Sequence, residues 1–385
     1  MLDSQITDNE YSTSADSLDT ETSENADSLY SNTDSPDSDS VFNETTEGEN
    51  NITSKSNNGE NNGEKTIDVD GDFNGNLDQA IAQANDGDVV LLGSNTYYTD
   101  GIDLNKSITI DGQQGSVING GGTSESIIKV DSKASGATIQ DVEITNGNNG
   151  ISGSGATNLT LQNLNLNDIG LDKTIRDGQN NTAIALNSAD GLKIFNSKIS
   201  NVGRKGIGIG GTDGAVVDGM TIQNINLDAQ HAQSHDVGGI KLFNTNNAVI
   251  SNNQLSDING HHIWNDTTNG TTIKGNVATG VGTDFLAPKF NDNVQMTGIY
   301  NEKSSNATVS GNKVDSTDEF LAFKATAFST ETMSMENNDF SSFELDTKDY
   351  WVNKGAEIKI ATTEDPSKAD FSLMSDAYYA EANIG

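Results

Sequence analysis

One eight-residue pattern recurs eight times in this chain and limits what the chain can fold into. Its third and eighth positions are apolar, and its fifth and sixth positions are usually Asn, Asp or Gly. The copies are ATIQDVEI, LTLQNLNL, LKIFNSKI, AVVDGMTI, AVISNNQL, TTIKGNVA, ATVSGNKV and MSMENNDF, which begin at residues 137, 159, 192, 215, 248, 271, 307 and 333. Successive starts are 22, 33, 23, 33, 23, 36 and 26 residues apart, so about ten extra residues are added to three of the periods.

A basic period of about 22 to 26 residues, with short strands and no helices between them, is typical of a solenoid of parallel strands. The composition agrees with this prediction. Only 32% of the 385 residues are hydrophobic, 39 are glycine and three are proline. Such a chain favours many short strands joined by Gly and Asn turns over a bundle of helices.

Asparagine occupies the sixth position in the last four copies of the unit. If equivalent positions stack, these residues form an asparagine ladder, in which each amide bonds to the copy above it. Asparagine also tolerates the left-handed backbone that we expect at a sharp corner. We interpret the ladder as a structural feature. Its members are Asn253, Asn276, Asn312 and Asn338.

A second strand in each period carries an apolar residue that we expect to face inward. The residue after it then faces outward, so Lys241, Trp264 and Tyr300 should form a row with about 4.8 Å between neighbours. The expected inward residues are Ile151, Ile184, Ile207, Ile240, Ile263, Ile299 and Leu321. The outward places two residues further along hold Phe243, Asp266 and Glu302.

The extra residues of the three longer periods fall at 168–182, 228–238 and 280–297, each just before an outward-facing strand. We expect all three insertions to leave the solenoid at the same corner and to wall one side of a groove over the outward row. Long loops of this kind are usually functional. Their charged and histidine residues include Arg176, Asp177, His231, His235, Asp236, Lys289 and Asp292.

The first part of the chain differs from the rest in composition. Residues 1–64 contain 16 acidic residues and one basic residue, Lys55, and few apolar ones. Such a segment buries too little apolar area to offset the entropy of ordering, so we predict a disordered acidic tail at 1–64 and a folded domain at 65–385. The domain should open with a short amphipathic helix over 77–84 and a buried strand over 89–92.

The formal net charge of −36 argues against nucleic acid or an anionic membrane as a partner, because phosphate binding needs a basic surface. The same charge favours calcium as a possible cofactor. No cysteine occurs, which excludes disulfides and thiolate metal sites. No basic and apolar leader and no apolar window of membrane-spanning length is readable, so we expect no membrane insertion. We expect a monomer.

Two short motifs match known binding sequences only in part. DGDFNG at 70–75 matches the first half of a calcium loop, but Ile81 stands where the bidentate glutamate is required. We interpret it as the entry to a helix. GIGIGG at 206–211 has the spacing of a dinucleotide-binding loop, but the sequence around it predicts strands, so nucleotide binding is rejected.

Several stretches together resemble the right-handed parallel β-helix of the pectate-lyase-like superfamily, over about residues 65–385. They are LDQAIAQANDGDVVLL, SITIDGQ, the repeated TIxxN and VSGN units, GIK followed by GHHIWND, and ADFSLMSDAYYAEANIG. The resemblance implies an all-β fold, a right-handed parallel β-helix with a short N-terminal capping helix. It also implies an extracellular or cell-surface location and a polysaccharide partner.

The superfamily includes lyases, epimerases, hydrolases, tailspikes and adhesins, so fold alone does not fix activity. The DPHE of mannuronan epimerases is missing, and so is the NTD, DD, GHG, RIK order of polygalacturonases; here GHH at 260–262 follows GIK. A hydrolase is therefore disfavoured. We expect a lyase or C5-epimerase acting on an acidic uronate polysaccharide. The alternative is a non-catalytic, carbohydrate-binding or adhesin-type surface protein.

Uronate lysis and C5 epimerisation both begin by removing the proton next to a carboxylate, so the site needs a group that neutralises the carboxylate, a base and a proton donor. An outward tryptophan also offers a sugar-stacking surface. One of His261 and His262 should face the groove while the other helps to close the turn. The expected catalytic residues are Lys241, His235, Arg204, His261 and Tyr300. The expected substrate-binding residues are Trp264, Asp266, Arg176, Lys289 and Glu302, and the expected calcium ligand is Asp236.

Overall fold

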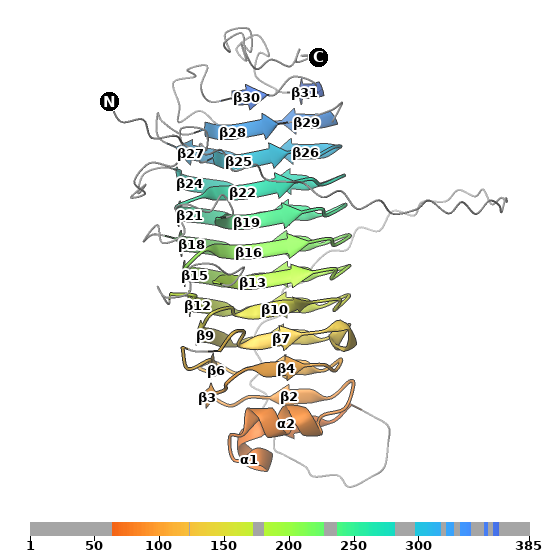
Figure 1. The fold of residues 1–385 in the computed structure, drawn as a ribbon, viewed down its shortest axis with the longest axis vertical. Coiled ribbons are helices and arrows are strands. Elements are labelled where there is room, and N and C mark those ends of the chain that lie inside the picture. Colours follow the sequence, from red (N-terminus) through yellow and green to blue (C-terminus); the bar gives the residue numbers. More distant parts are fainter. Residues whose placement is uncertain are drawn as a thin grey trace, which may run out of the picture. The chain divides into compact units, whose positions relative to one another are not determined.

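The computed structural model describes residues 64–122, 124–171, 181–226, 237–281, 297–316, 321–326, 332–339, 350–352 and 357–361. Strands in these residues form three sheets, and every strand pairing is parallel. Each period of the chain gives one strand to each sheet in turn, which makes one rung, and successive rungs lie one above another (Figure 1). The predicted stack of parallel strands is confirmed.

The three sheets are named by their strand counts within the described residues. The twelve-stranded sheet contains β1 (Thr66–Asp68), β2 (Val89–Leu91), β5 (Thr109–Asp111), β8 (Thr138–Gln140), β11 (Thr160–Gln162), β14 (Lys193–Phe195), β17 (Val216–Asp218), β20 (Val249–Ser251), β23 (Thr272–Lys274), β26 (Ala307–Ser310), β29 (Thr332–Glu336) and β31 (Glu357–Ala361). The ten-stranded sheet contains β4 (Ile102–Leu104), β7 (Ile128–Val130), β10 (Ile151–Ser154), β13 (Thr182–Asn187), β16 (Lys205–Gly210), β19 (Gly238–Phe243), β22 (His261–Asp266), β25 (Thr297–Glu302), β28 (Leu321–Thr326) and β30 (Tyr350–Val352). The nine-stranded sheet contains β3 (Thr96–Tyr98), β6 (Val117–Asn119), β9 (Glu143–Gly147), β12 (Asn165–Ile169), β15 (Lys198–Val202), β18 (Thr221–Ile225), β21 (Gln254–Ile258), β24 (Val277–Val281) and β27 (Lys313–Ser316).

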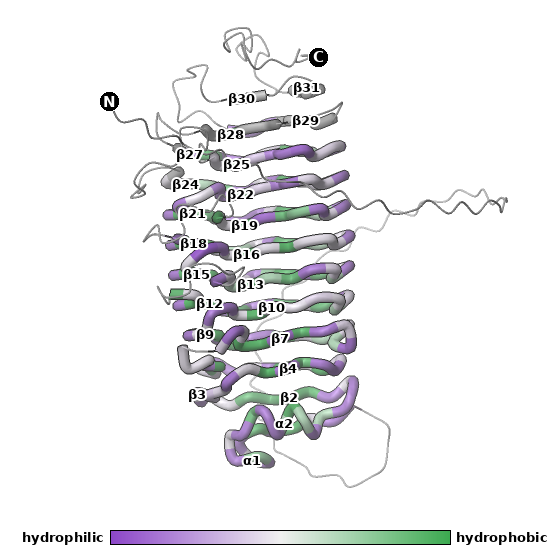
Figure 2. The backbone as a smooth tube through the Cα atoms, viewed as in Figure 1, coloured by the Kyte–Doolittle hydropathy of each residue, from purple (hydrophilic) through white to green (hydrophobic). Residues whose placement is uncertain are grey.

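The core consists of stacked aliphatic side chains. In the twelve-stranded sheet the middle residues of three-residue strands stack in register, as Ile110, Ile139, Leu161 and Ile194 do, and all four are fully buried. Side chains alternate between the two faces of a strand, so one apolar residue in each short strand is enough to fill its layer. Hydrophobic residues therefore recur along the strands of successive rungs (Figure 2).

The ten-stranded sheet confirms the predicted register over six strands. Ile151, Ile184, Ile207, Ile240, Ile263 and Ile299 pair in succession, and all are buried. The next rung corrects the prediction. Ile299 pairs with Phe323, which is fully buried, while the expected Leu321 pairs with Thr297. Because a shift of two residues keeps the same faces, alternation alone does not choose between these two registers.

The corners of the repeat correct a second expectation. In all eight copies of the unit it is the fifth residue that adopts the left-handed backbone, with φ between 46° and 67°. These residues are Asp141, Asn163, Asn196, Gly219, Asn252, Gly275, Gly311 and Asn337. The ladder asparagines at the sixth position are not among the residues with positive φ. Asparagine is therefore present there for its amide and not for its backbone conformation.

The asparagine ladder itself is confirmed. The backbone N–H and the side-chain Nδ2 of Asn253 both donate to Oδ1 of Asn276, over 3.0 and 2.9 Å. Asn276 makes the same two bonds to Asn312, and Asn312 makes them to Asn338. Each Nδ2 also donates to a main-chain carbonyl in the preceding rung, as Asn276 does to Ile250 over 3.0 Å. The ladder thus satisfies polar groups that the corner would otherwise bury without partners.

Two helices precede β2 in the chain, α1 (Val69–Phe73) and α2 (Leu77–Gln83). The predicted helix over 77–84 corresponds to α2, whose Leu77, Ala80 and Ile81 are buried in the core. The DGDFNG motif forms α1 and its end, and Asp70 accepts hydrogen bonds from the Tyr97 hydroxyl and from Asn95. The motif was interpreted as the entry to a helix; its first four residues instead belong to α1, and Asn74 and Gly75 form the turn that leads to α2. Among the described residues no helix is long and apolar enough to cross a membrane.

We predict that removing residues 1–64 leaves the folded domain intact. Every described strand lies after this segment, and Lys65, which bonds to Asp88 and to Val89 beside β2, is retained. The thermal midpoint should change by less than about 2 °C, the shift that a destabilisation of about 1 kcal/mol produces in a large domain. Circular dichroism melting of the full chain and the shortened chain measures this. An insoluble or unfolded 65–385 chain would place the boundary elsewhere.

Candidate functional site

Outward-facing residues of β16, β19, β22 and β25 form three rows, which we call the outward grid. Parallel pairing fixes its geometry, because register partners on neighbouring strands lie about 4.8 Å apart. The first row holds Lys205, Gly238 and His261; the second holds Gly208, Lys241, Trp264 and Tyr300; the third holds Gly210, Phe243, Asp266 and Glu302. The expected neighbours Lys241, Trp264 and Tyr300 are therefore adjacent in register.

Three aromatic rings pack together on the grid. The rings of Trp264 and Tyr300 stack at 5.7 Å between centroids with an angle of 21° between planes. The His261 ring lies 5.0 Å from that of Trp264 and 4.9 Å from that of Tyr300. Trp264 and Tyr300 are only 8% and 7% exposed, although neither belongs to the solenoid core. The row faces outward as expected, but its aromatic part is largely covered.

Lys241 lies at the edge of this aromatic group. Its Nζ is 3.6 Å from the centroid of the Trp264 ring and 3.6 Å from Oδ2 of Asp266. The Phe243 ring centroid is 5.9 Å from the same nitrogen. A cation over an aromatic face and beside a carboxylate is held by both interactions. These contacts fix the position of the ammonium group on the outward grid.

Two carboxyl groups lie on neighbouring strands in the third row. Asp266 accepts a hydrogen bond from the Thr267 hydroxyl, and Glu302 accepts one from the Trp264 indole over 3.1 Å. Burial raises the pKa of the Asp266 carboxyl and the negative charge of Glu302 adds to the rise, while Thr267 and the ammonium group of Lys241 oppose it. The pair therefore contains one carboxyl that is protonated more readily than usual.

Lys205 belongs to the grid and is absent from the sequence-based list of site residues. Its ammonium nitrogen is 3.9 Å from the point where a side chain on Gly208 would begin, and Lys241 is the register partner of Gly208. Lys205 thus lies over Gly208, whereas the ammonium group of Lys241 on the next strand lies against Trp264 and Asp266 of β22. Arg204, an expected catalytic residue, is buried immediately before β16.

A comparison with family models identifies the architecture. Residues 172–340 match the model described as "Right handed beta helix region". The chain carries a right-handed parallel β-helix. The match spans fewer than half of the 385 residues, and the three parallel sheets continue the same β-helix on the N-terminal side of it. The right-handed parallel β-helix that the sequence resemblance implied is confirmed.

The chain is similar to several solved structures. An alginate lyase from Paenibacillus sp. str. FPU-7 aligns over 77% of this chain and 98% of its own, with 17% identity and a TM-score of 0.50. A lacto-N-biosidase from Eubacterium ramulus aligns over 74% and 64%, with 12% identity and a TM-score of 0.42. The Dettilon tailspike protein aligns over 79% and 69%, with 14% identity and a TM-score of 0.45. No curated protein sequence matches the chain.

The two neighbouring histidines of the β-helix point to opposite sides of their strand. His261 contacts the outward aromatic group, whereas His262 is fully buried, and its Nε2 lies 3.1 Å from the carbonyl oxygen of Thr279 in the next rung. Burial lowers the pKa of His262 to about 4, and the contact with Thr279 opposes this shift. His262 is therefore a neutral structural residue at neutral pH.

We predict that His262 makes the β-helix less stable in acid. The unfolded chain protonates this imidazole near pH 6.5, whereas the folded chain does so only near pH 4, so unfolding takes up a proton between these values. The stabilisation is complete above pH 6.5 and declines by about 3 kcal/mol as the pH falls to 4. Denaturant unfolding at several pH values measures it. His262→Gln should lack this part of the slope, and equal slopes in both chains would contradict the assignment.

Four expected site residues fall outside the described part of the chain: Arg176, His235, Asp236 and Lys289. The same holds for Asp177, His231 and Asp292, and so for the expected groove wall. Their roles stay predictions. Among the described residues, no group of three or more His, Asp or Glu side chains is placed to hold a metal ion.

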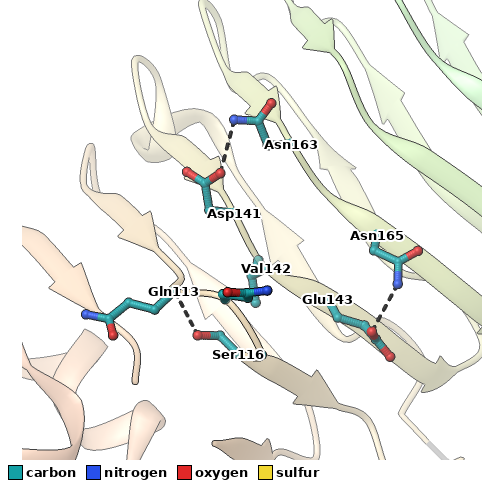
Figure 3. A pocket seen from close by; sticks show the side chains of 9 residues that line it. Gln113, Ser116, Asp141, Val142, Glu143, Asn163 and Asn165 are labelled. Carbon is teal, nitrogen blue, oxygen red and sulfur yellow. Dashed lines mark hydrogen bonds between the residues drawn. The ribbon is translucent and has the colours of Figure 1, made fainter. Parts of the chain in front are cut away.

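A hollow of about 350 Å³ lies away from the outward grid, at the corner between the twelve-stranded and nine-stranded sheets. Its polar side chains bond to one another (Figure 3): Asn163 donates to Asp141, and Asn165 donates to Glu143, each over 3.0 Å. Both carboxylates already have amide partners, and no cation lies among the lining residues. We therefore assign the candidate site to the outward grid.

Proposed function

We propose that the outward grid binds and acts on an acidic polysaccharide, as a uronate lyase or C5-epimerase. One observation carries this proposal. In a chain with a net charge of −36, two lysines lie on the neighbouring outward strands β16 and β19: Lys205, whose ammonium group lies over Gly208, and Lys241, the register partner of Gly208. Two ammonium groups on neighbouring strands, one of them beside a position without a side chain, are suited to a ligand that bears a carboxylate. The proposal rests on these residues and not on the likeness to the alginate lyase, which concerns the fold.

The reaction follows from this placement. Lys241 and Lys205 neutralise the carboxylate of the bound sugar, which makes the neighbouring C5 proton easier to remove. His261 and Tyr300, whose rings are in contact, are the proposed base and acid. In lysis the carbanion electrons form the C4–C5 double bond and expel the C4 oxygen, which takes up a proton. In epimerisation a proton returns to C5 from the opposite face.

Calcium, an extracellular or cell-surface location and a monomeric state are parts of the same proposal. A calcium ion near Asp236 would help the lysines to neutralise the substrate carboxylate. Activity measured with calcium and with a chelator tests this part. If a chelator abolishes the activity and added calcium restores it, a bound calcium ion is supported.

One observation favours a second candidate function, glycoside hydrolysis. Asp266 and Glu302 are register partners on neighbouring strands, and the pKa of Asp266 is raised by burial first and by Glu302 in addition. A carboxyl with a raised pKa beside a second carboxylate is the arrangement that glycoside hydrolysis uses. A binding protein without activity is the third outcome.

Incubation with a panel of uronate polymers separates these functions. Lysis produces an unsaturated product that absorbs in the ultraviolet, together with new reducing ends. Hydrolysis produces reducing ends alone. Epimerisation produces neither and is detected by NMR as a changed ratio of the two C5 epimers. We expect lysis or epimerisation. Reducing ends without unsaturation would favour the second candidate, and binding without any product would leave a binding protein.

A further inference from the structure

Among the glycines of the outward grid, Gly208 has the most room for a side chain. The nearest atoms to a side chain placed there would be Cε and Nζ of Lys205, at 3.8 and 3.9 Å, which is ordinary contact. Gly210, two residues along the strand, differs because Oδ1 of Asn187 lies over it. The backbone at Gly208 does not need the left-handed region. A side chain is thus compatible with the fold at Gly208, and its absence leaves room above the strand.

Phe243, the register partner of Gly210, is the exposed aromatic residue of the grid. It is 52% exposed, whereas Trp264 and Tyr300 are 8% and 7% exposed. The faces of the Trp264 ring already contact Lys241 and Tyr300. Phe243 lies two residues beyond Lys241 on β19, which is the strand next to Gly208. An exposed aromatic ring of this kind offers an apolar face to a ligand.

From these contacts we infer that Gly208 is the floor of a subsite for one carboxylated sugar ring. The C–H face of the sugar packs on the Phe243 ring, and its carboxylate lies between the ammonium groups of Lys205 and Lys241. The inference rests on the proposed function and makes it more specific, because it names the residues that select the sugar. Lys205 selects the acidic group, and Phe243 and Gly208 select a flat ring without regard to charge.

Binding of defined oligomers tests this subsite. The probes are mannuronate, guluronate and galacturonate oligomers, each also with its carboxylates reduced to alcohols, and calorimetry measures affinity. Phe243→Ala should weaken binding of both the acidic and the reduced form by about tenfold, since it removes stacking area. Lys205→Gln should weaken the acidic form alone. Gly208→Val should abolish binding of both forms without lowering the thermal midpoint.

Tyr98→Ala is the matched control, because Tyr98 is 75% exposed but lies on β3 of the nine-stranded sheet. Its affinity for every oligomer should equal that of the parent chain. If the parent binds an oligomer and Gly208→Val or Phe243→Ala binds it equally well, the subsite is wrong while the proposed function stands. If the parent neither binds nor converts any oligomer, the proposed function itself fails, and the subsite with it.

Discussion

Replacing Lys241 with alanine is expected to lower kcat/KM on an acidic polysaccharide by about 100-fold or more. The size follows from the loss of one preorganised charge at the place where negative charge develops, which typically reduces turnover by about 10² to 10³. Stability should change little, because the interactions of Lys241 with Asp266 and Trp264 are at a partly exposed site and contribute at most about 2 kcal/mol together.

Two further variants make this result specific. Lys241→Arg retains the charge and should recover part of the lost activity, although a planar guanidinium does not reproduce the geometry of an ammonium. Lys193→Ala removes an exposed lysine from β14 of the twelve-stranded sheet and should leave kcat/KM unchanged. Full activity in Lys241→Ala, with the parent active, would remove Lys241 from the reaction.

Replacing Asn276 with leucine is expected to destabilise the β-helix by about 3 to 5 kcal/mol. The substitution leaves the backbone N–H and the Nδ2 of Asn253 without their acceptor, and the carbonyl of Ile250 without one donor. Each buried polar group without a partner costs about 1 to 3 kcal/mol. The thermal midpoint should fall by about 10 °C.

Met220→Leu is the matched control for this experiment. Met220 occupies the same sixth position in an earlier rung, is equally buried and has no amide. A swap of Met for Leu usually costs less than about 1.5 kcal/mol. Thermal melting and ligand binding of both variants should be compared. If Asn276→Leu has the same thermal midpoint as the Met220→Leu control but a changed affinity for the ligand, the ladder is part of the site and not of the scaffold.

The core register was predictable because it depends on one residue type at one spacing. A one-residue slip would move every inward isoleucine of the ten-stranded sheet to the outer face, so the sequence specifies those positions strongly. A two-residue slip preserves the faces, and this is why Leu321 and Phe323 were not distinguished. The last rungs therefore required the structure.

The composition of the outward grid was predictable only in part. Strict alternation gave the outward positions of Lys241, Trp264 and Tyr300, but alternation says nothing about how far neighbouring outward rings cover one another. Lys205 was missed because the alternation breaks at the start of β16. There Gly206 and Ile207 both face inward, since a side chain on Gly206 would meet Ile222. The glycine before the isoleucine, repeated as Gly239 before Ile240, is the sequence signal that marks this break.

The position of the outward grid along the stack of rungs determines how early it is exposed when the β-helix partly unfolds. In a solenoid each rung contacts only its neighbours, so fraying starts at the two ends of the stack and advances one rung at a time. Four strands of the ten-stranded sheet lie below β16, from β4 to β13, and β25, β28 and β30 lie above β22. Amide hydrogens of β16, β19 and β22 are thus among the last that fraying from either end exposes to solvent. Lys205 and Lys241 should therefore keep their spacing while the amide hydrogens near the two ends of the stack exchange with solvent.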